Sequence, residues 1–463
     1  MSERSTQPWG RRSADGAAIV PAGAFPHASQ LRGAGSALPF GNGRSYGDSC
    51  QNRAGTLLDS RGDARILAFD AQAGLLTAQA GVLLSEITAH VAPSGWFLPV
   101  TPGTQFVTLG GAIANDIHGK NHHRRGTFGA WVEALTLERS DRGLVECSPA
   151  AEAPLFRATI SGMGLTGLIR SATIRLLKVA SLAIAETTTR FDRLEDYFEL
   201  AAEADERHEY AVAWIDSLSR GSALGRGHLI AGDHAATGPR EGVARPPLAS
   251  VPFVPPVSPL KGLALRAFNE AYFRKAPRGV SRRTVPFDAF FYPLDRVGRW
   301  NRLYGPGGLH QHQSVLPFAT AREGVRALLD CARAHGQGSF LTVLKRFGET
   351  ASPGLTSFPR PGYTLTLDFP HRGAKTLAML AELDAITVAA GGAVNPYKDA
   401  RMSKETFAAG FAQWRRLEAL RDPAIVSDFW KRTALALPQA GADIVNEGLQ
   451  STAPRSSLVY SAA

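Results

Sequence analysis

Three histidines and five glycines fall within residues 110–129, which read GGAIANDIHGKNHHRRGTFG. Two of the histidines, His118 and His122, are four residues apart, the spacing that places two metal ligands on one face of a helix. Gly119 and the trailing HRRGTFG disfavour a helix, Asp116 is the only carboxylate nearby, and the flanking lysine and arginines would repel a cation. We therefore predict no metal site here.

The glycines of this segment suit an anion better than a metal. Successive glycines expose backbone N–H groups, and Lys120, Arg124 and Arg125 add positive charge. A second glycine-rich loop, PFGNGRSYGDS, occupies residues 39–49, and each loop follows a strand-like run. The two loops could hold a diphosphate from both sides. A pair of tight turns without a ligand is the alternative.

A GxGxxG pattern occurs in GMGLTG, at Gly162, Gly164 and Gly167. In a nicotinamide-binding turn this pattern follows a strand and opens a helix. Here AAEAPLFRATIS before it is helix-like, and LIRSATIRLL after it alternates like a strand. The order is reversed, so the pattern indicates a tight turn whose backbone can approach a flat ligand.

The motifs GNGRSYGDS, PGTQFVTLGGAIANDIHGKNHHRRGTFG, GMGLTGLI and YKDAR, in this order, resemble the flavoproteins of the vanillyl-alcohol oxidase and p-cresol methylhydroxylase superfamily. DIHGKNHH, GGLHQHQSVLP, FLTVLKRFG, LDFP and DPAIVSDFWKR are similar to the subgroup of oxidase components of decaprenylphosphoryl-β-D-ribose 2′-epimerases. The similarity runs from about Trp9 to about residue 436. It implies an α+β fold: a two-subdomain PCMH-type FAD-binding domain, and a substrate domain with a mainly antiparallel sheet covered by helices.

The resemblance implies FAD, with the glycine loops on its pyrophosphate. Many superfamily members tether the flavin to a histidine in the first loop, where this chain has Arg44 before Ser45, so we expect noncovalent FAD. The cofactor positions carried over are Gly41, Gly43, Arg44, Ser45, Tyr46, Gly47, Pro102, Gly103, Thr104, Thr108, Gly110, Gly111, Ala112, Asn115, Asp116, His118, Gly119, Asn121, His122, Gly126, Gly164, Thr166, Gly167, Ile169 and Lys398.

Two residues are expected to be catalytic. Lys398, in YKDAR, matches the family lysine that stabilises negative charge at N1 and the C2 carbonyl of the reduced flavin. His118 is the expected general base, because the ordinary histidine pKa suits that role at neutral pH. Its alternative role is to shape the pocket.

The resemblance also implies a substrate pocket in which Lys120 and Lys345 meet a phosphoryl group. Mycobacterial members of the subgroup carry a cysteine where this chain has Thr366, an asparagine at Thr364 and a tyrosine at Phe291. A cysteine-directed inhibitor should therefore not bond covalently, and the sugar could differ. The substrate-binding positions carried over are Lys120, Trp214, Gln311, Gln313, Lys345 and Thr366.

The expected activity is oxidation of the 2′-hydroxyl of a polyprenyl-phosphoryl-β-D-ribose to a ketone. This is the first half of an epimerisation to the arabinose donor of cell-envelope glycans. The expected partner is an NADH-dependent short-chain reductase. The first alternative is a soluble FAD-dependent alditol or aldonolactone oxidase, and the second is a basic nucleic-acid or metal-binding protein without redox activity.

The order of strand-like and helix-like segments suggests three parts and a tail. Residues 1–180 are expected to form the main FAD-binding domain, 181–394 the substrate domain with a mobile loop near 221–283, 395–440 a segment that returns to the FAD domain, and 441–463 a disordered tail. Within the substrate domain, residues 221–260 predict a long surface loop. The predicted strands there are AFFYPLD, HQHQSVLPF, SFLTVLKRFG and YTLTLDFP, and the predicted helices of the chain cover residues 83–95, 321–336 and 375–392.

Composition bounds the location and the partners. Three widely spaced cysteines and the lack of a signal or membrane-spanning segment favour the cytoplasm. The net charge of +10 concentrates in residues 261–283, where seven cations with interleaved apolar residues face one glutamate, Glu270. This pattern suits peripheral contact with the inner membrane, the periplasmic face not excluded, or the solvated face of a helix. We expect no nucleic acid, because no known nucleic-acid module accompanies it.

Overall fold

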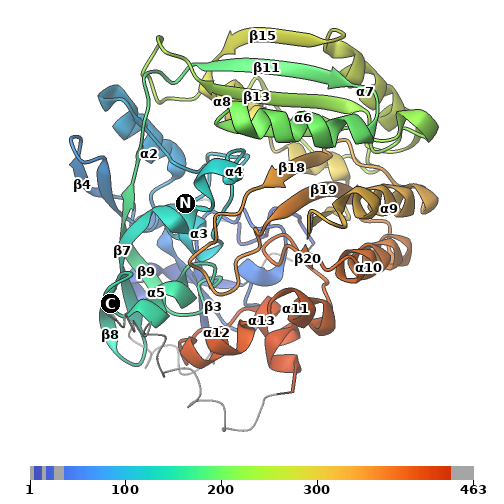
Figure 1. Cartoon of the computed structure of the whole chain (residues 1–463). Helices are drawn as coiled ribbons and strands as arrows, with labels where there is room; N and C mark the ends of the chain where they lie inside the picture. The colour runs from blue at the N-terminus through green and yellow to red at the C-terminus, as the bar shows by residue number, and fades with distance from the viewer. Residues whose placement is uncertain (1–4, 13–16, 26–35, 439–463) are drawn as a thin grey trace, which may run out of the picture.

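The computed structural model describes residues 5–12, 17–25 and 36–438, and the predicted tail at 441–463 lies outside them. The elements gather into two small ladders and three larger sheets, with helices between and around them (Figure 1). Among the described residues, no helix has the length and apolar character needed to cross a bilayer.

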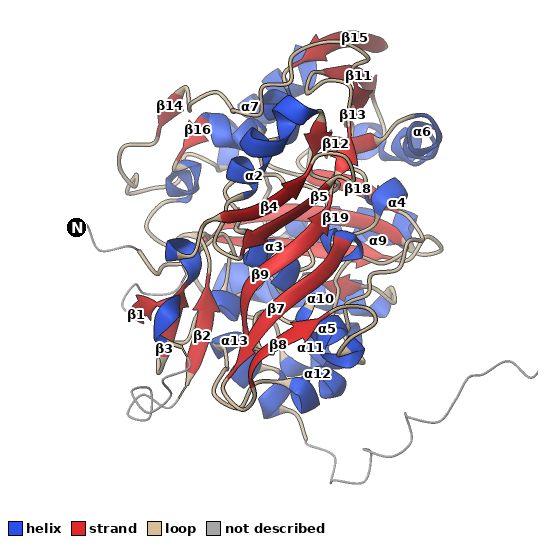
Figure 2. Cartoon of the chain, turned by 90° about the vertical axis from the view of Figure 1, so that its left-hand side faces the viewer, coloured by secondary structure: helices blue, strands red, loops and turns tan. Residues whose placement is uncertain are grey.

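The N-terminal half contributes two sheets that stand side by side (Figure 2). The first is parallel, in the order β1 (Ala18–Pro21), β3 (Thr56–Asp59), β2 (Ala37–Phe40). The second is antiparallel, in the order β4 (Ile66–Asp70), β5 (Leu75–Gln79), β9 (Leu168–Arg175), β7 (Val132–Arg139), β8 (Gly143–Cys147). The first glycine-rich loop follows β2, and the second segment, residues 110–129, contains most of α3 (Leu109–Ala114), which packs against β5 and β9.

The third sheet is an eight-stranded antiparallel sheet. Its order is β15 (Val280–Val285), β11 (Ile184–Phe191), β13 (Gly227–His234), β12 (Tyr210–Ile215), β18 (Val343–Phe347), β19 (Gly362–Pro370), β17 (Leu309–Leu316), β20 (Ala393–Val394). The two-stranded ladders pair β6 (Trp96–Phe97) with β10 (Leu177–Lys178), and β14 (Ala249–Ser250) with β16 (Val297–Gly298).

Side-chain alternation gives the eight-stranded sheet two different faces. Leu344, Leu365 and Leu367 point into a core shared with α6 (Leu194–Arg207), α9 (Ala321–Ala334) and α10 (Ala374–Ala389). The intervening residues point to the opposite face, toward the N-terminal sheets. The remaining helices are α2 (Leu84–Val91), α4 (His122–Arg125), α5 (Ala153–Thr159), α7 (Gly262–Lys275), α8 (Phe287–Phe291), α11 (Lys404–Gly410), α12 (Trp414–Leu420) and α13 (Asp428–Arg432).

The α+β class and the large antiparallel sheet predicted from the sequence are confirmed, and so are the helices predicted over 83–95, 321–336 and 375–392. Two local predictions are wrong. Residues 289–295 are not a strand: Phe290 and Phe291 belong to helix α8 and turn into the core against Tyr210. Residues 221–260 are not one loop, because β13 forms within them, supported by pairing with β11 and β12 on both sides.

The C-terminal segment is held against the first sheet by partly buried ion pairs and aromatic packing. Arg432 Nη2 lies 2.8 Å from Asp48 Oδ1 and 2.9 Å from Asp399 Oδ2. Phe429 and Trp430 are fully buried in the core that the C-terminal helices share with β2 and β3. The loop after β2 is thus fixed by the C-terminal segment.

Replacing Arg432 by methionine tests this clamp. The variant leaves Asp48 without a cation and Asp399 with Arg401 alone, at 3.6 Å, so we expect the free energy of unfolding to fall by about 3 kcal/mol. Urea denaturation followed by circular dichroism measures the change. The exposed Arg416→Met variant is the control, and its free energy of unfolding should change by no more than about 0.5 kcal/mol. Equal effects in both variants would contradict the clamp.

Candidate active site

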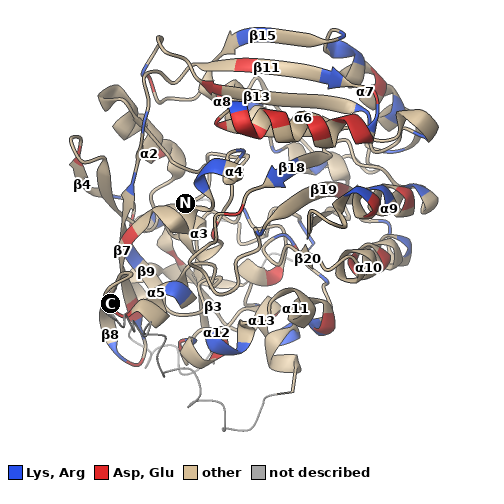
Figure 3. Cartoon of the chain, viewed as in Figure 1, with Lys and Arg blue, Asp and Glu red and all other residues tan. Residues whose placement is uncertain are grey.

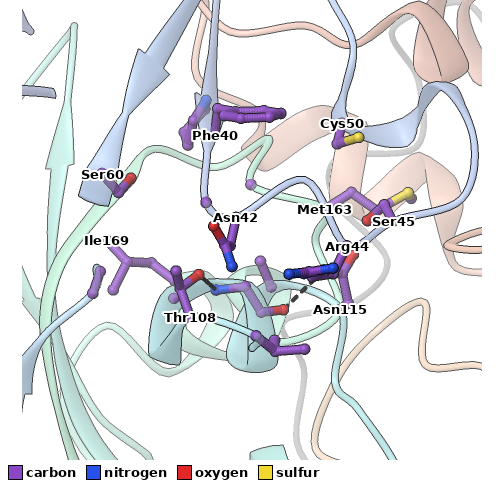
Figure 4. A pocket seen from close by; sticks show the side chains of 18 of the residues that line it. Phe40, Asn42, Arg44, Ser45, Cys50, Ser60, Thr108, Asn115, Met163 and Ile169 are labelled. Carbon is purple, nitrogen blue, oxygen red and sulfur yellow. Dashed lines mark hydrogen bonds between the residues drawn. The ribbon is translucent and has the colours of Figure 1, made fainter. Parts of the chain in front are cut away.

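A narrow cavity lies between the loop after β2, helix α3 and the GMGLTG turn (Figure 4). The two glycine-rich loops predicted to act together do converge there. Gly41 and Gly43 form one side, Gly110 and Gly111 another, and Gly164 belongs to the turn that closes it. Gly43 has φ +60°, and a Cβ there would lie 3.2 Å from the ring of Phe40, so the loop needs glycine at this point.

The loop after β2 offers backbone donors to this cavity. Among the described residues, none accepts a hydrogen bond from the backbone N–H groups of Gly43, Arg44 or Ser45. Consecutive free N–H groups form a nest for an anion. The Arg44 guanidinium stacks on Trp9, 4.4 Å from the ring centroid, and burial lowers its pKa while Asp295 opposes that shift.

A second, wider cavity of about 360 Å³ adjoins the first. Arg44, Ser45, Val107 and Asn115 line both, so the two form one elongated site. The wide cavity is closed on its far side by the eight-stranded sheet. Its volume falls within the range of small-molecule sites.

The register of the sheet determines which side chains reach the wide cavity. Gln313, Thr366, Val343 and Trp214 are aligned partners on four adjacent strands, so they form one row across this face. All four line the cavity. One row of the sheet therefore supplies an amide, a hydroxyl, an aliphatic side chain and an indole to the same wall.

Three lysines converge on this cavity: Lys120, Lys345 and Lys398. Burial lowers the pKa of Lys120 to about 8, opposed by Glu186, and lowers that of Lys398 to about 8, opposed by Asp368. Burial, with Lys120 and Lys398 nearby, lowers the pKa of Lys345 to about 7. Each shift reports the cost of enclosing positive charge, which an anionic ligand would offset.

His118 is held between Lys345 and Gln313. Lys345 Nζ lies 3.0 Å from its Nδ1, and Gln313 Nε2 lies 3.0 Å from its Nε2. The Gln313 amide is oriented by its other contacts, since its Oε1 accepts a hydrogen bond from Asn395 Nδ2 at 2.8 Å and its Nε2 donates to Thr364 Oγ1 at 3.1 Å. The Nε2 of His118 is therefore an acceptor.

A neutral imidazole carries one N–H, so this arrangement places the proton of His118 on Nδ1. Lys345 must then accept that hydrogen bond as a neutral amine. The pKa directions agree: burial and then Lys345 lower the pKa of His118 well below its usual value, and the pKa of Lys345 is near 7. The pair can take up a proton at neutral pH.

Lys398 lines the same cavity as this pair. Its Nζ lies 4.3 Å from the centroid of the Tyr46 ring. The charge of Asp368 raises the pKa of Lys398, and Gln311 Nε2 donates a hydrogen bond to Asp368 Oδ1 at 2.6 Å. Burial raises the pKa of Asp368 to about 7, which lowers its ability to neutralise Lys398.

The structure brings most of the predicted residues to these walls. The narrow cavity is lined by Gly41, Gly43, Arg44, Ser45, Thr108, Gly110, Gly111, Asn115, Gly164, Gly167 and Ile169. The wide cavity is lined by Tyr46, Pro102, Gly103, Thr104, Asp116, His118, Gly119 and Lys398, and by all the predicted substrate positions, Lys120, Trp214, Gln311, Gln313, Lys345 and Thr366.

Six predicted cofactor residues lie behind the walls instead: Gly47, Ala112, Asn121, His122, Gly126 and Thr166. They support the site by packing. Gly47 passes so close to Asp399 that a Cβ would lie 1.5 Å from its carbonyl oxygen. The His122 ring packs on Phe347, and Asn121 Nδ2 donates to the carbonyl of Pro99 at 2.9 Å.

Several wall residues were not predicted. Asn42 and Met163 line the narrow cavity, and Trp9, Asp295 and Tyr397 line the wide one. Asn42 and Tyr397 sit inside motifs already singled out, so their neighbours were the available signal. Trp9 and Asp295 had no such signal in the sequence, because tertiary packing alone brings them close to Arg44.

The elongated site suits FAD. Free N–H groups beside a glycine-lined narrow cavity fit a diphosphate, and the wide cavity can accept a flat ring with a cation, Lys398, at its edge. The residues that would hold the cofactor are those of the loop after β2, the turn before α3, and Lys398.

Comparison with known proteins agrees with this geometry. Residues 34–148 match the family described as FAD binding domain. The chain is 34% identical over 413 residues to decaprenylphosphoryl-β-D-ribose oxidase of Mycolicibacterium smegmatis, covering 85% of this chain and 88% of that protein. It is 36% identical over 384 residues to an uncharacterised protein of Streptomyces coelicolor, covering 76% of this chain and all of that one.

A narrower match reaches a sugar-lactone oxidase. Mouse L-gulonolactone oxidase is 30% identical over 111 residues, which cover 24% of this chain and 25% of that protein. The broad matches and the FAD binding domain together define the relationship. The chain belongs to the FAD-dependent oxidoreductases of the PCMH type, in the family that includes decaprenylphosphoryl-β-D-ribose oxidase.

Proposed function

We propose that the protein oxidises the 2′-hydroxyl of a polyprenyl-phosphoryl-β-D-ribose to the 2′-ketone with noncovalently bound FAD. The convergence of Lys120, Lys345 and Lys398 on one cavity carries this proposal. Lys120 and Lys398, with pKa values of about 8, are protonated at neutral pH. A neutral polyol would leave their charge incompletely compensated, whereas a sugar phosphate supplies the opposite charge. The 34% identity to decaprenylphosphoryl-β-D-ribose oxidase over 85% of the chain supports the same class of substrate.

The side chains divide the chemical work. Bound FAD would accept the hydride from C2′ of the sugar. The neutral Lys345 amine, hydrogen-bonded to His118, is placed to accept the hydroxyl proton. Lys398 supplies a positive charge where negative charge develops on the ring, and Lys120 faces the phosphoryl group. Gln311 and Thr366 offer hydrogen-bonding groups for the ribose hydroxyls.

The residues around the flavin support noncovalent binding. Arg44 occupies the position of the tethering histidine and cannot form that bond. Cys50, which lines the narrow cavity, is held as a thiol, because burial raises its pKa to about 12. A protonated thiol is a poor nucleophile.

The ketone product requires a second, reducing step to reach the arabinose epimer. An NADH-dependent short-chain reductase would supply it. An alditol or aldonolactone oxidase is the rival function, and its support is limited to the match of about a quarter of the chain with L-gulonolactone oxidase.

A substrate panel tests the proposed function. We expect a polyprenyl-phosphoryl-β-D-ribose with a short isoprenoid to be turned over with an artificial electron acceptor, and alditols and aldonolactones to give a kcat/KM lower by at least about 100-fold. The Lys120→Met variant should raise KM for the phosphorylated substrate and leave any slow alditol activity unchanged. A preference for the soluble sugars would support the rival function.

Acid precipitation tests the noncovalent cofactor. The purified protein should be yellow, and its flavin should remain in the supernatant after the protein is precipitated and removed. Flavin retained in the pellet would show a covalent bond and refute this part of the proposal.

The pH dependence tests the role of Lys345. Because the neutral amine is the active form and its pKa is lowered to about 7, kcat/KM should rise as pH increases through about 7. The Lys345→Arg variant stays protonated, so we expect a loss of about 100-fold and no rise near pH 7. The exposed Lys178→Arg variant should behave like the unmodified protein. Survival of the rise in Lys345→Arg would assign it to another group.

A further inference from the structure

Helix α7 forms part of the wall between the wide cavity and the solvent. Tyr272 lines the cavity, and its ring lies 4.7 Å from that of Trp214. Leu265 and Phe273 are buried beneath the helix. The inward side of α7 therefore packs against the cavity wall and the core.

The outward side of α7 is apolar where a solvated helix carries polar residues. At 100° per residue, Leu263, Ala264, Ala267, Phe268 and Ala271 fall on one exposed arc, which Arg274 and Lys275 end in the last turn. Leu263 is 82% exposed and Phe268 is 43% exposed. The described residues leave this arc without a covering element.

The loop that leads into α7 extends the apolar surface. Phe253 is 66% exposed and Val257 is 56% exposed. The loop is nevertheless anchored, since Arg302 donates to the carbonyl of Val251 at 3.0 Å and Ser258 Oγ donates to that of Leu303 at 2.9 Å. These large side chains are thus presented outward by a fixed backbone.

Positive charge surrounds this apolar surface. Lys261, Arg266, Lys275 and Arg278 are exposed on or beside α7, where Figure 3 shows a concentration of basic residues. The one acidic residue, Glu270, is already paired with Arg226 and Arg274. The surface combines exposed apolar side chains with uncompensated cations.

We propose that α7 and the loop before it, residues 251–278, dock on an anionic lipid bilayer. The apolar arc would enter the region between head groups and acyl chains, and the cations would meet the lipid phosphates. Charge complementarity selects this occupant, because a protein surface would have to match a long apolar arc and several unpaired cations together.

The same face connects with the interior of the cavity. Exposed Phe268 stacks on Tyr272 with centroids 6.0 Å apart and contacts Phe340 at 5.8 Å; Phe340 in turn contacts Trp300 at 6.5 Å. Tyr272 and Trp300 line the cavity. If the proposed function holds, and only then, this aromatic path provides an apolar exit toward the membrane for the polyprenyl chain.

Vesicle sedimentation of the holoenzyme without substrate tests the docking. We expect binding to phosphatidylcholine vesicles that contain phosphatidylglycerol, weakening at high salt, and little binding to phosphatidylcholine alone. The Phe253→Ser/Leu263→Ser variant should lose at least tenfold in affinity, and so should Lys275→Glu/Arg278→Glu. Leu144→Ser is the control, because Leu144 is 66% exposed on β8, far from α7 in Figure 1.

Three results would overturn the docking proposal. They are absence of binding to anionic vesicles, equal binding by the control and both double variants, and a concentration-dependent dimer that the same double variants abolish. Because no substrate is present, failure here leaves the proposed oxidation intact. Conversely, failure of the substrate panel leaves the vesicle result standing.

Discussion

The burial of three lysine side chains in one cavity is the constraint on which the site depends. Moving a charged amine away from water is costly, so an isolated buried lysine loses its proton or gains a partner. Asp368 partly offsets the burial of Lys398, and Glu186 partly offsets that of Lys120, whose Nζ also donates to the carbonyl of Phe290. The pKa of Lys345 is lowered by burial and by the two other lysines. Anionic ligands stabilise such a cavity, and their absence favours neutral amines that can accept protons.

The scaffold meets this constraint by bringing together two rigid surfaces. The eight-stranded sheet uses one face for a leucine-rich core and the other for Gln311, Gln313, Lys345 and Thr366. Because alternation is a property of every strand, the packing that stabilises the sheet also aims the polar side chains. The glycine-rich loops supply the opposing surface, and the C-terminal clamp through Arg432 holds the first of them in place.

Sequence patterns predicted the class of fold and most of the site, for reasons that differ between its parts. The convergence of the glycine loops was predictable because short motifs of glycine and charged residues indicate, from the local sequence alone, a tight turn that can bind an anion. The sequence could not distinguish the residues behind the cavity walls from those that line them, because both belong to the same motifs. In the structure, Gly47 packs closely against Asp399, and His122 packs on Phe347. β13 and α8 were missed because strand pairing and aromatic packing from distant segments outweigh local preference.

The proton position on His118 illustrates what only the structure supplies. The sequence identified the histidine, but its partners Lys345 and Gln313 are more than 190 residues away along the chain. From their geometry we propose that the pair of His118 and Lys345, rather than the imidazole alone, accepts the proton.

We propose that the C2′–H bond of a polyprenyl-phosphoryl ribose is broken and that bound FAD would accept its hydride. The most direct measurement is the rate of flavin bleaching in an anaerobic single turnover with substrate deuterated at C2′. We expect a primary isotope effect at C2′ and none for deuterium at C3′. Equal rates with the unlabelled, C2′-deuterated and C3′-deuterated substrates, or bleaching slowed only by the C3′ label, would contradict hydride transfer from C2′.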